Sequence, residues 1–334
     1  MIEVDWARLK AHELRKLADD NAIVILPIAS MEQHGPHLPV MTDTRLGQEI
    51  AHRAARKAYS HRAVVVAPVV WSGLSEHHMP FGGTLTLSHD TFRRVVSDLI
   101  EAITRQGFKD ILISNSHGGN VIAIQQILDE LAPTSRATLV ATNYDVEAGE
   151  DLTRHLQDQL GVMHAGEAET SMMLVCEHDL VDMSNITKLA SPEGGKHFLS
   201  VGKGSYRWRP FTHMTKNGLA GNPVRSNAAK GEKMLEAGAK ALANLIMDPE
   251  TWAASKDLRW AEKNIGEQKC QMNLCFMILR LLQKKVKTYW VICLIKMVAM
   301  VSIRFWLDHL KPLRLILSCM SYLCIQASPM KNVL

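Results

Sequence analysis

The chain has 334 residues, 47% of them apolar, which is enough to fill the core of one large domain or two ordinary ones. Its formal charge is +4, but residues 269–334 hold ten Lys and Arg and a single acid, Asp308, so residues 1–268 carry 28 basic and 33 acidic side chains. This slightly acidic body lacks the basic surface that nucleic-acid binding requires, and we expect no nucleic-acid partner.

The N-terminal segment, residues 1–20, is polar and amphipathic. It lacks the basic-then-apolar pattern of a signal peptide, so we expect a cytoplasmic protein. Cys176 is the single cysteine of the body, and the other five lie near the C-terminus without a CxxC spacing. The cysteines therefore predict neither a disulfide framework nor a zinc knuckle.

Short runs rich in Val, Ile and Leu alternate with longer segments whose apolar residues recur every three or four positions. The short runs predict buried strands at 22–28, 63–70, 110–114 and 137–143. The longer segments predict helices at 44–58, 90–106 and 121–131. Strand, helix and strand repeated in this way indicate an α/β fold with a mainly parallel sheet covered on both faces. In such folds the chemistry lies on loops beyond the carboxyl ends of the strands.

Residues 180–223 are loop-like, with glycines between aromatic and basic residues. A segment of this length is usually a lid, a binding loop or an oligomer contact. Residues 227–247 then predict a final helix, which would complete the main domain.

The composition changes near Asn264, after which acids nearly vanish and Cys, Leu, Ile, Met and Lys dominate. Residues 289–303 are apolar apart from Lys296 but fall short of the roughly 18–20 residues that a membrane span needs, so we expect no stable membrane insertion. A buried or dimer-packing helix, a tail foreign to the fold such as sequence read in a shifted frame, and a peripheral membrane helix remain open. We divide the chain into a domain at 1–262 and an atypical tail at 263–334.

The first polar motif follows the first predicted strand and runs from Ser30 to Asp43. Glu32 and His34 are two positions apart, so an extended backbone would place both on one side, while Gly35 and two prolines bend the chain and bring Asp43 back. Carboxylates with an imidazole suit Zn²⁺, Mn²⁺ or Fe²⁺. An ordinary surface loop is the alternative, but so many charged and polar residues directly after a buried strand favour a metal site.

Two further motifs have the same character. His117 is followed by Gly118 and Gly119 after the third predicted strand, where paired glycines let the backbone turn next to a ligand; a plain helix cap is the alternative. His164 and Glu169 stand at the start of a helix from which both can reach inward. Glu167, between them, is better explained as a first-turn acid favoured by the helix dipole, so Glu169 is the candidate ligand.

Together these motifs resemble the creatininase family, over about residues 1–252. The resemblance rests on Glu-Gln-His-Gly-Pro-His-Leu-Pro at 32–39 with a nearby Asp, on His-Gly-Gly-Asn at 117–120, and on His-Ala-Gly-Glu-x-Glu-Thr-Ser at 164–171. The loop at 75–84 is also similar, although Gly82 stands where the family has proline.

The resemblance implies a three-layer α/β/α sandwich, commonly assembled as a hexamer, with two divalent metal ions per chain (Zn, Mn or Fe). Carried over by position, one ion would be bound by Glu32, Asp43 and His117. The other would be bound by His34 and by Asp43, which bridges the two. Creatinine hydrolases complete the second ion with a glutamate where this chain has Gly119, so Glu169 would have to supply that carboxylate.

His164 matches the family histidine that moves protons at the scissile bond, and it is the expected catalytic residue. His37, His77 and His78 are alternatives, or partners that orient the ligands. We therefore expect an amidohydrolase that opens a C–N bond of a cyclic amide or related small molecule by a metal-bridged hydroxide. Relatives acting on formamides, peptides or cyclic sugar ketones, and an inactive metal-binding scaffold, are the alternatives.

Overall fold

The computed structural model describes residues 2–189 and 205–260, and the chain divides into two compact units, Met1–Ala254 and Ser255–Leu334. The first unit is built on four parallel strands: β1 (Ile23–Ile28), β2 (Val64–Val66), β3 (Asp110–Asn115) and β4 (Thr138–Asn143). They lie in the order β2-β1-β3-β4. In this order the chain leaves β1 towards one edge of the sheet, to β2, and leaves β3 towards the other edge, to β4. The loops that follow β1 and β3 therefore diverge, and open α/β sheets bind ligands at such a point.

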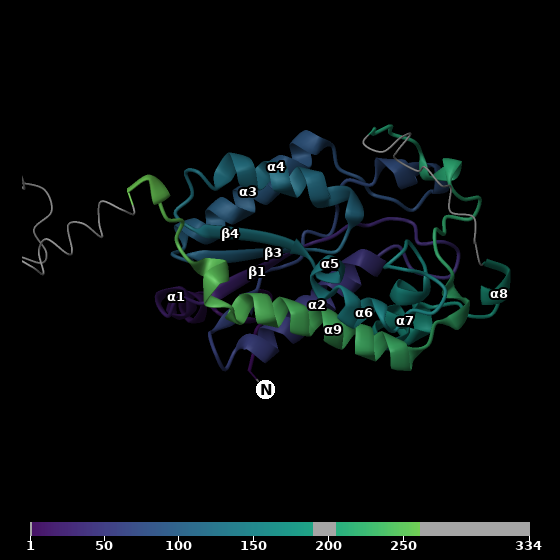
Figure 1. Ribbon diagram of the computed structural model, residues 1–334, viewed down its shortest axis with the longest axis horizontal. Coiled ribbons are helices and arrows are strands. Elements are labelled where there is room, and N and C mark those ends of the chain that lie inside the picture. Colours follow the sequence, from purple (N-terminus) through teal and green to yellow (C-terminus); the bar gives the residue numbers. More distant parts are fainter. Residues whose placement is uncertain (1, 190–204, 261–334) are drawn as a thin grey trace, which may run out of the picture. The chain divides into compact units, whose positions relative to one another are not determined.

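Helices cover both faces of this sheet (Figure 1). One face carries α3 (His89–Arg105) and α4 (Val121–Leu131), and the other carries α2 (Thr42–Ala58), α7 (Glu167–Cys176) and α9 (Ala228–Met247). The shorter helices are α1 (Ala11–Asp19), α5 (Tyr144–Ala148), α6 (Glu150–Thr153) and α8 (Ile186–Leu189). The expected three-layer α/β/α sandwich with a parallel central sheet is confirmed.

β1 shows why its sequence is apolar without alternation. Ile23 and Ile25 belong to the core shared with α2, α7 and α9, whereas Val24, Leu26 and Ile28 belong to the core on the α3 and α4 side. Since successive side chains of a strand point to opposite faces, both faces must be apolar when both are covered. The two cores hold the strand ends, and therefore the loops that follow them, in place.

The second strand is shorter than the run at 63–70 suggested, because its register on β1 slips by one residue after Ala67: Ala67 N donates to Ile25 O (2.8 Å), and the next bond to β1 comes from Val70 in place of Val69. The backbone nevertheless stays beside β1, since Val70 N donates to Pro27 O (2.9 Å) and Ala29 N donates to Val70 O (2.9 Å). The helix expected at 227–247 begins one residue later, with the Asn227 side chain as its N-cap.

The segment expected to be irregular, 180–223, contains only short helical turns where the structure describes it, among them Phe211–His213 and Pro223–Arg225. The part of it at 190–204 lies outside the described residues. Among the described residues no helix is long and apolar enough to cross a membrane. The apolar run at 289–303 also lies outside them, so its three interpretations stay predictions.

We expect a protein truncated after Glu262 to fold, bind metal and be more soluble than the full chain. Two apolar cores already surround the sheet within residues 4–246, and the truncation removes an apolar, cationic stretch that can promote association. Melting curves and metal content of the two proteins test this expectation. A truncated protein that aggregates, melts at a lower temperature or loses its metal would show that the tail is part of the folded core.

Candidate active site

The three polar motifs converge beyond the carboxyl ends of β1 and β3. Glu32 and His34 lie on the loop that follows β1, and Asp43 lies in the first turn of α2. His117 follows β3, and Glu169 lies in the first turn of α7. All five candidate ligands are buried, which is rare for groups of this kind unless they pair with one another or bind an ion.

One donor set consists of Glu32, Asp43 and His117. His117 Nδ1 lies 3.2 Å from Glu32 Oε2 and 3.1 Å from Asp43 Oδ2. Asp43 Oδ2 is buried and has no hydrogen-bond partner among the described residues. The three atoms therefore face one another, and Asp43 Oδ2 lacks the hydrogen bond that would normally satisfy a buried oxygen, as a ligand of a cation would.

The other donor set consists of His34, Asp43 and Glu169. His34 Nε2 lies 3.1 Å from Asp43 Oδ1 and 3.7 Å from Glu169 Oε2. Ala165 N donates to Glu169 Oε2 (2.6 Å), and Ala165 itself has a φ of +55°, a turn that aims the start of α7 at the site. Asp43 thus offers one oxygen to each set.

The outer nitrogens of three histidines bond backbone carbonyls. His34 Nδ1 donates to Glu32 O (3.0 Å), His117 Nε2 to Leu74 O (3.1 Å), and His164 Nε2 to Gln33 O (2.8 Å). Because a carbonyl oxygen only accepts, each outer nitrogen carries a proton, which leaves the inner nitrogen as the one that a metal ion can bind. This is how proteins fix the tautomer of metal-binding histidines. The donors present therefore fit a divalent cation.

Charge in the site leads to the same conclusion. Burial alone would lower the pKa of His34, but Asp43 and Glu169 raise it to about 10. For His117 burial also acts to lower the pKa, and Glu32 and Asp43 raise it well above the usual value. The carboxylates thus hold extra protons on the inner nitrogens, where a metal ion and a proton compete for the same lone pair.

His164 lies beside these sets, with its Nδ1 3.5 Å from Glu32 Oε1. Its ring centroid is 4.3 Å from those of His34 and His78 and 4.9 Å from that of Phe211. Burial, followed by the charge on His34 and His78, lowers its pKa well below the usual value, so the ring is neutral. Glu32, His34 and His164 also form a third possible donor set, so the geometry allows His164 either to ligate or to move protons.

Glu167 is placed apart from the cluster, as its interpretation as a first-turn acid implied. Its carboxylate forms an ion pair with Lys230, and its Oε2 accepts from Gln157 N (2.9 Å). The loop motif at 75–84 contributes more than expected, because Ser75 Oγ donates to Glu32 Oε2 (2.5 Å) and His78 Nε2 lies 3.3 Å from Glu32 Oε1. Sequence reasoning missed Ser75, and no signal marked it beyond its place in that motif.

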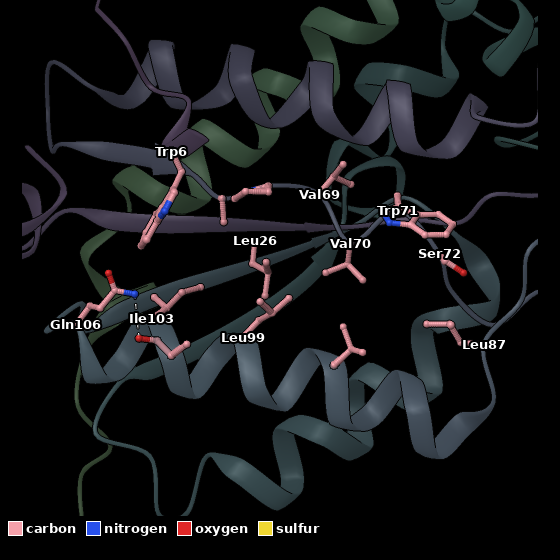
Figure 2. A pocket seen from close by; sticks show the side chains of 14 residues that line it. Trp6, Leu26, Val69, Val70, Trp71, Ser72, Leu87, Leu99, Ile103 and Gln106 are labelled. Atoms are coloured by element: carbon pink, nitrogen blue, oxygen red, sulfur yellow. Dashed lines mark hydrogen bonds between the residues drawn. The ribbon is translucent and has the colours of Figure 1, made fainter. Parts of the chain in front are cut away.

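A cavity of about 360 Å³ opens onto the donor sets. It is lined by all the candidate ligands except His34, and by other residues that include His77, His78, Tyr144, Asp145 and Phe211. A larger cavity, of about 520 Å³, lies elsewhere, between α3, β1 and the segment 67–72 that follows β2 (Figure 2). That cavity is walled by Trp6, Leu26, Trp71, Leu99 and other mostly apolar side chains, with no titratable group. A choice by cavity volume alone would therefore miss the candidate metal ligands.

His37 lies behind the site and predicts a pH dependence of stability. Its Nε2 bonds Thr170 Oγ1 (2.9 Å), and burial, helped by the charge on His34, lowers its pKa from 6.5 to about 4. Below pH 6.5 the unfolded chain takes up the proton first, so the stability that neutral His37 contributes is complete above pH 6.5 and is lost as the pH falls towards 4. At pH 5 the loss is about 2 kcal/mol.

Chemical denaturation at pH 7 and pH 5 measures this loss. The wild type should lose about 2 kcal/mol more of its free energy of unfolding than His37→Gln, which keeps a polar group beside Thr170 but does not titrate. Equal losses in the two proteins would mean that His37 does not set the acid sensitivity.

Several known proteins are similar to this chain in sequence. The family model for creatininase (creatinine amidohydrolase) matches residues 7–246. The chain is 27% identical to a mycofactocin precursor peptide peptidase of Mycolicibacterium smegmatis, over 66% of this chain and 82% of the relative. It is 26% identical to a creatinine amidohydrolase of Pseudomonas putida, over 55% of this chain and 74% of the relative.

Another relative, 26% identical over 47% of this chain and 63% of its own length, is the 2-amino-5-formylamino-6-ribosylaminopyrimidin-4(3H)-one 5'-monophosphate deformylase of Methanobrevibacter smithii. Among solved structures, the one described as Creatininase Mn has a TM-score of 0.61 and 23% identity, and the match covers 76% of this chain and all of that one. This likeness shows the shared fold. The family match spans most of the chain, and we conclude that the chain belongs to the creatininase family of hydrolases.

Proposed function

We propose that this protein is a binuclear metal-dependent amidohydrolase. The observation that carries the proposal is that Asp43 belongs to two donor sets, one with Glu32 and His117 and one with His34 and Glu169. A carboxylate with one oxygen turned to each set suits a bridge between two ions. Glu32, Asp43 and Glu169 can supply negative charge to two divalent cations, and because burial raises the pKa of Glu169 to about 8, metal binding there would displace a proton.

The donor chemistry narrows the choice of metal. Imidazole nitrogens with carboxylate oxygens suit Zn²⁺, Mn²⁺ and Fe²⁺ better than Ca²⁺ or Mg²⁺, which prefer oxygen ligands. One of the similar solved structures, Creatininase Mn, names such a metal. When bound, two ions would polarise the substrate carbonyl and lower the pKa of a water molecule.

Gly119 explains why the second set uses Glu169. A Cβ atom at Gly119 would lie 2.4 Å from both Leu74 O and His117 Nε2, so no side chain fits there unless His117 moves. The glutamate that creatinine hydrolases have at this position is therefore excluded by the local packing. Glu169, from α7, lies with its Oε2 3.7 Å from His34 Nε2 instead.

We assign proton transfer to His164. The ring is neutral, lines the cavity, and has its outer nitrogen already bonded to Gln33 O, so Nδ1 is free to accept a proton and pass it to the leaving nitrogen. Phe211 covers the ring and keeps water from one side of it.

Three of the relatives support a substrate class. A peptidase, a creatinine amidohydrolase and a deformylase all cleave a C–N bond, and we propose the same bond type here, in a small molecule or a peptide end that enters a cavity of about 360 Å³. The packing at Gly119 favours a substrate other than creatinine. The hexameric assembly implied by the resemblance stays a prediction.

Activity assays test the proposal. Protein stripped of metal and then reloaded with Zn²⁺, Mn²⁺ or Fe²⁺ should be assayed with lactams, N-formyl compounds, short peptides and an inosose. We expect hydrolysis of at least one C–N substrate, present in a reloaded protein and absent in the stripped one. Turnover that is equal without metal, or that is confined to the inosose, would overturn the proposal.

A further inference from the structure

Gln33 stands between Glu32 and His34, two of the three metal-ligand candidates of the first motif, and its side chain bonds other residues. Its side chain is buried, and its Nε2 atom lies 2.8 Å from His78 Nδ1, 3.0 Å from His164 Nε2 and 3.1 Å from Gly218 O. Its Oε1 atom accepts from Gly35 N (2.9 Å). One amide group thus touches two cavity histidines and a distant segment of chain.

The donor or acceptor character of these partners fixes which atom of the Gln33 amide is oxygen and which is nitrogen. Gly35 N–H only donates, so it must face the oxygen, and Gly218 O only accepts, so it must face the nitrogen. His164 Nε2 donates its own hydrogen to Gln33 O (2.8 Å) and so cannot accept from Nε2. The remaining hydrogen of Nε2 therefore points at His78 Nδ1, which has to present a lone pair. His78 therefore carries its proton on Nε2, the atom that lies 3.3 Å from Glu32 Oε1.

The same residue orients His164 through its backbone. His164 Nε2 donates to Gln33 O (2.8 Å), which places Nδ1 on the side of Glu32 Oε1. The Gly218 segment is tied to His164 as well, since Ala220 N donates to His164 O (2.9 Å). Two histidine rings and a remote loop thus depend on one position.

Gly218 is shaped to accept this contact. Its φ is +83°, and a Cβ atom there would lie 2.0 Å from Gln33 Oε1, so glycine alone lets the loop approach the amide. Seven residues earlier in the same segment, Phe211 packs on both rings, with centroids 4.4 Å from His78 and 4.9 Å from His164. The segment therefore covers the histidines with Phe211 and meets their common hydrogen-bond partner with Gly218.

We propose that Gln33 is a positioning residue that fixes the tautomer and ring orientation of His78 and His164 and makes them depend on the docking of the 211–220 segment. It acts through the histidines and does not touch the substrate. The arrangement gives productive rings only when that segment is in place over the cavity. The proposal rests on the proposed function for its kinetic consequence alone, because the tautomers follow from the hydrogen bonds.

Gln33→Met tests it, since methionine keeps the length of the side chain but neither donates nor accepts as an amide does. Solid-state ¹⁵N spectra of histidine-labelled, zinc-loaded protein report which ring nitrogens are protonated, and the signals of His78 and His164 are identified by their loss in His78→Asn and His164→Asn. We expect the His78 Nδ1 signal to shift and split into more than one ring state. The His164 signals should change less, because its bond to the backbone carbonyl remains.

A matched control is Gln159→Met. Gln159 is another amide that ties loops together, with its Oε1 accepting from Glu167 N (3.1 Å) and Asn222 N (3.2 Å), but it bonds neither histidine. Its substitution should leave the His78 and His164 signals in place. In the kinetic assay Gln33→Met should lower kcat by roughly 10- to 100-fold with KM and metal content little changed.

Unchanged His78 and His164 signals in Gln33→Met would overturn the proposal, as would equal changes in Gln159→Met. The outcome is independent of whether the protein is an amidohydrolase. Shifted histidine signals in a protein that hydrolyses no C–N substrate would retain Gln33 as a positioning residue and reject the proposed function.

Discussion

Asp43→Ala is expected to leave the protein with less than one divalent ion per chain, where the wild type should hold close to two. The two oxygens of Asp43 lie 3.1 Å from His34 Nε2 and 3.1 Å from His117 Nδ1, so one substitution removes a ligand from both donor sets. His34→Ala removes a ligand from one set and should lose one ion. Because the ions supply the electrostatic part of catalysis, Asp43→Ala should also lower kcat/KM by at least about 10³-fold.

Elemental analysis of extensively dialysed protein measures the ion content, with circular dichroism to confirm folding. Asp145→Ala is the matched control, since Asp145 is another acid that lines the same cavity and belongs to neither donor set. It should keep both ions. Unchanged ion content in Asp43→Ala, or an equal loss in Asp145→Ala, would contradict the bridge.

His164→Gln should keep both ions and lower kcat by about 10²–10⁴-fold, the range for loss of a general acid–base group. Glutamine can still bond Gln33 O, so the loop contact is kept while the group that carries the proton is lost. His77→Gln provides a comparison within the cavity, because His77 lies beside His78, with centroids 4.2 Å apart, and is in no donor set. Its effect should be much smaller.

The ion content of the same proteins separates two roles for His164. If His164→Gln loses an ion together with its rate, the donor set of Glu32, His34 and His164 is the real one, and the histidine is a ligand. If His77→Gln loses as much rate as His164→Gln, proton transfer has been assigned to the wrong side of the cavity.

The fold could be predicted from the sequence because a sheet with helices on both faces requires distinct apolar patterns in its strands and helices. β1 has to be apolar at every position, and α2, α3 and α4 have to be apolar on one side, so strand and helix periods are easily told apart. The second strand is the exception to this pattern. The run at 63–70 is as apolar as a full strand, but the regular ladder ends at Val66, because the register on β1 slips by one residue between Ala67 and Val70.

The site could be predicted in part, for a different reason. Glu32, His34 and His117 follow the carboxyl ends of parallel strands, so topology alone brings them together, and the structure places all five candidate ligands within the two donor sets. Ser75 and Gln33 could not be found in this way. Their roles depend on contacts with residues 42 or more positions away, and Ser and Gln carry no distinctive signal of their own.

The most direct test of the binuclear site is anomalous diffraction from crystals of protein purified without added metal. Two anomalous peaks are predicted, about 3.5–4 Å apart, as in two-metal hydrolases. One should lie among Glu32, Asp43 and His117 and the other among His34, Asp43 and Glu169, with Asp43 between them. A single peak, or a peak bound by Glu32, His34 and His164 with Asp43 left free, would contradict the account.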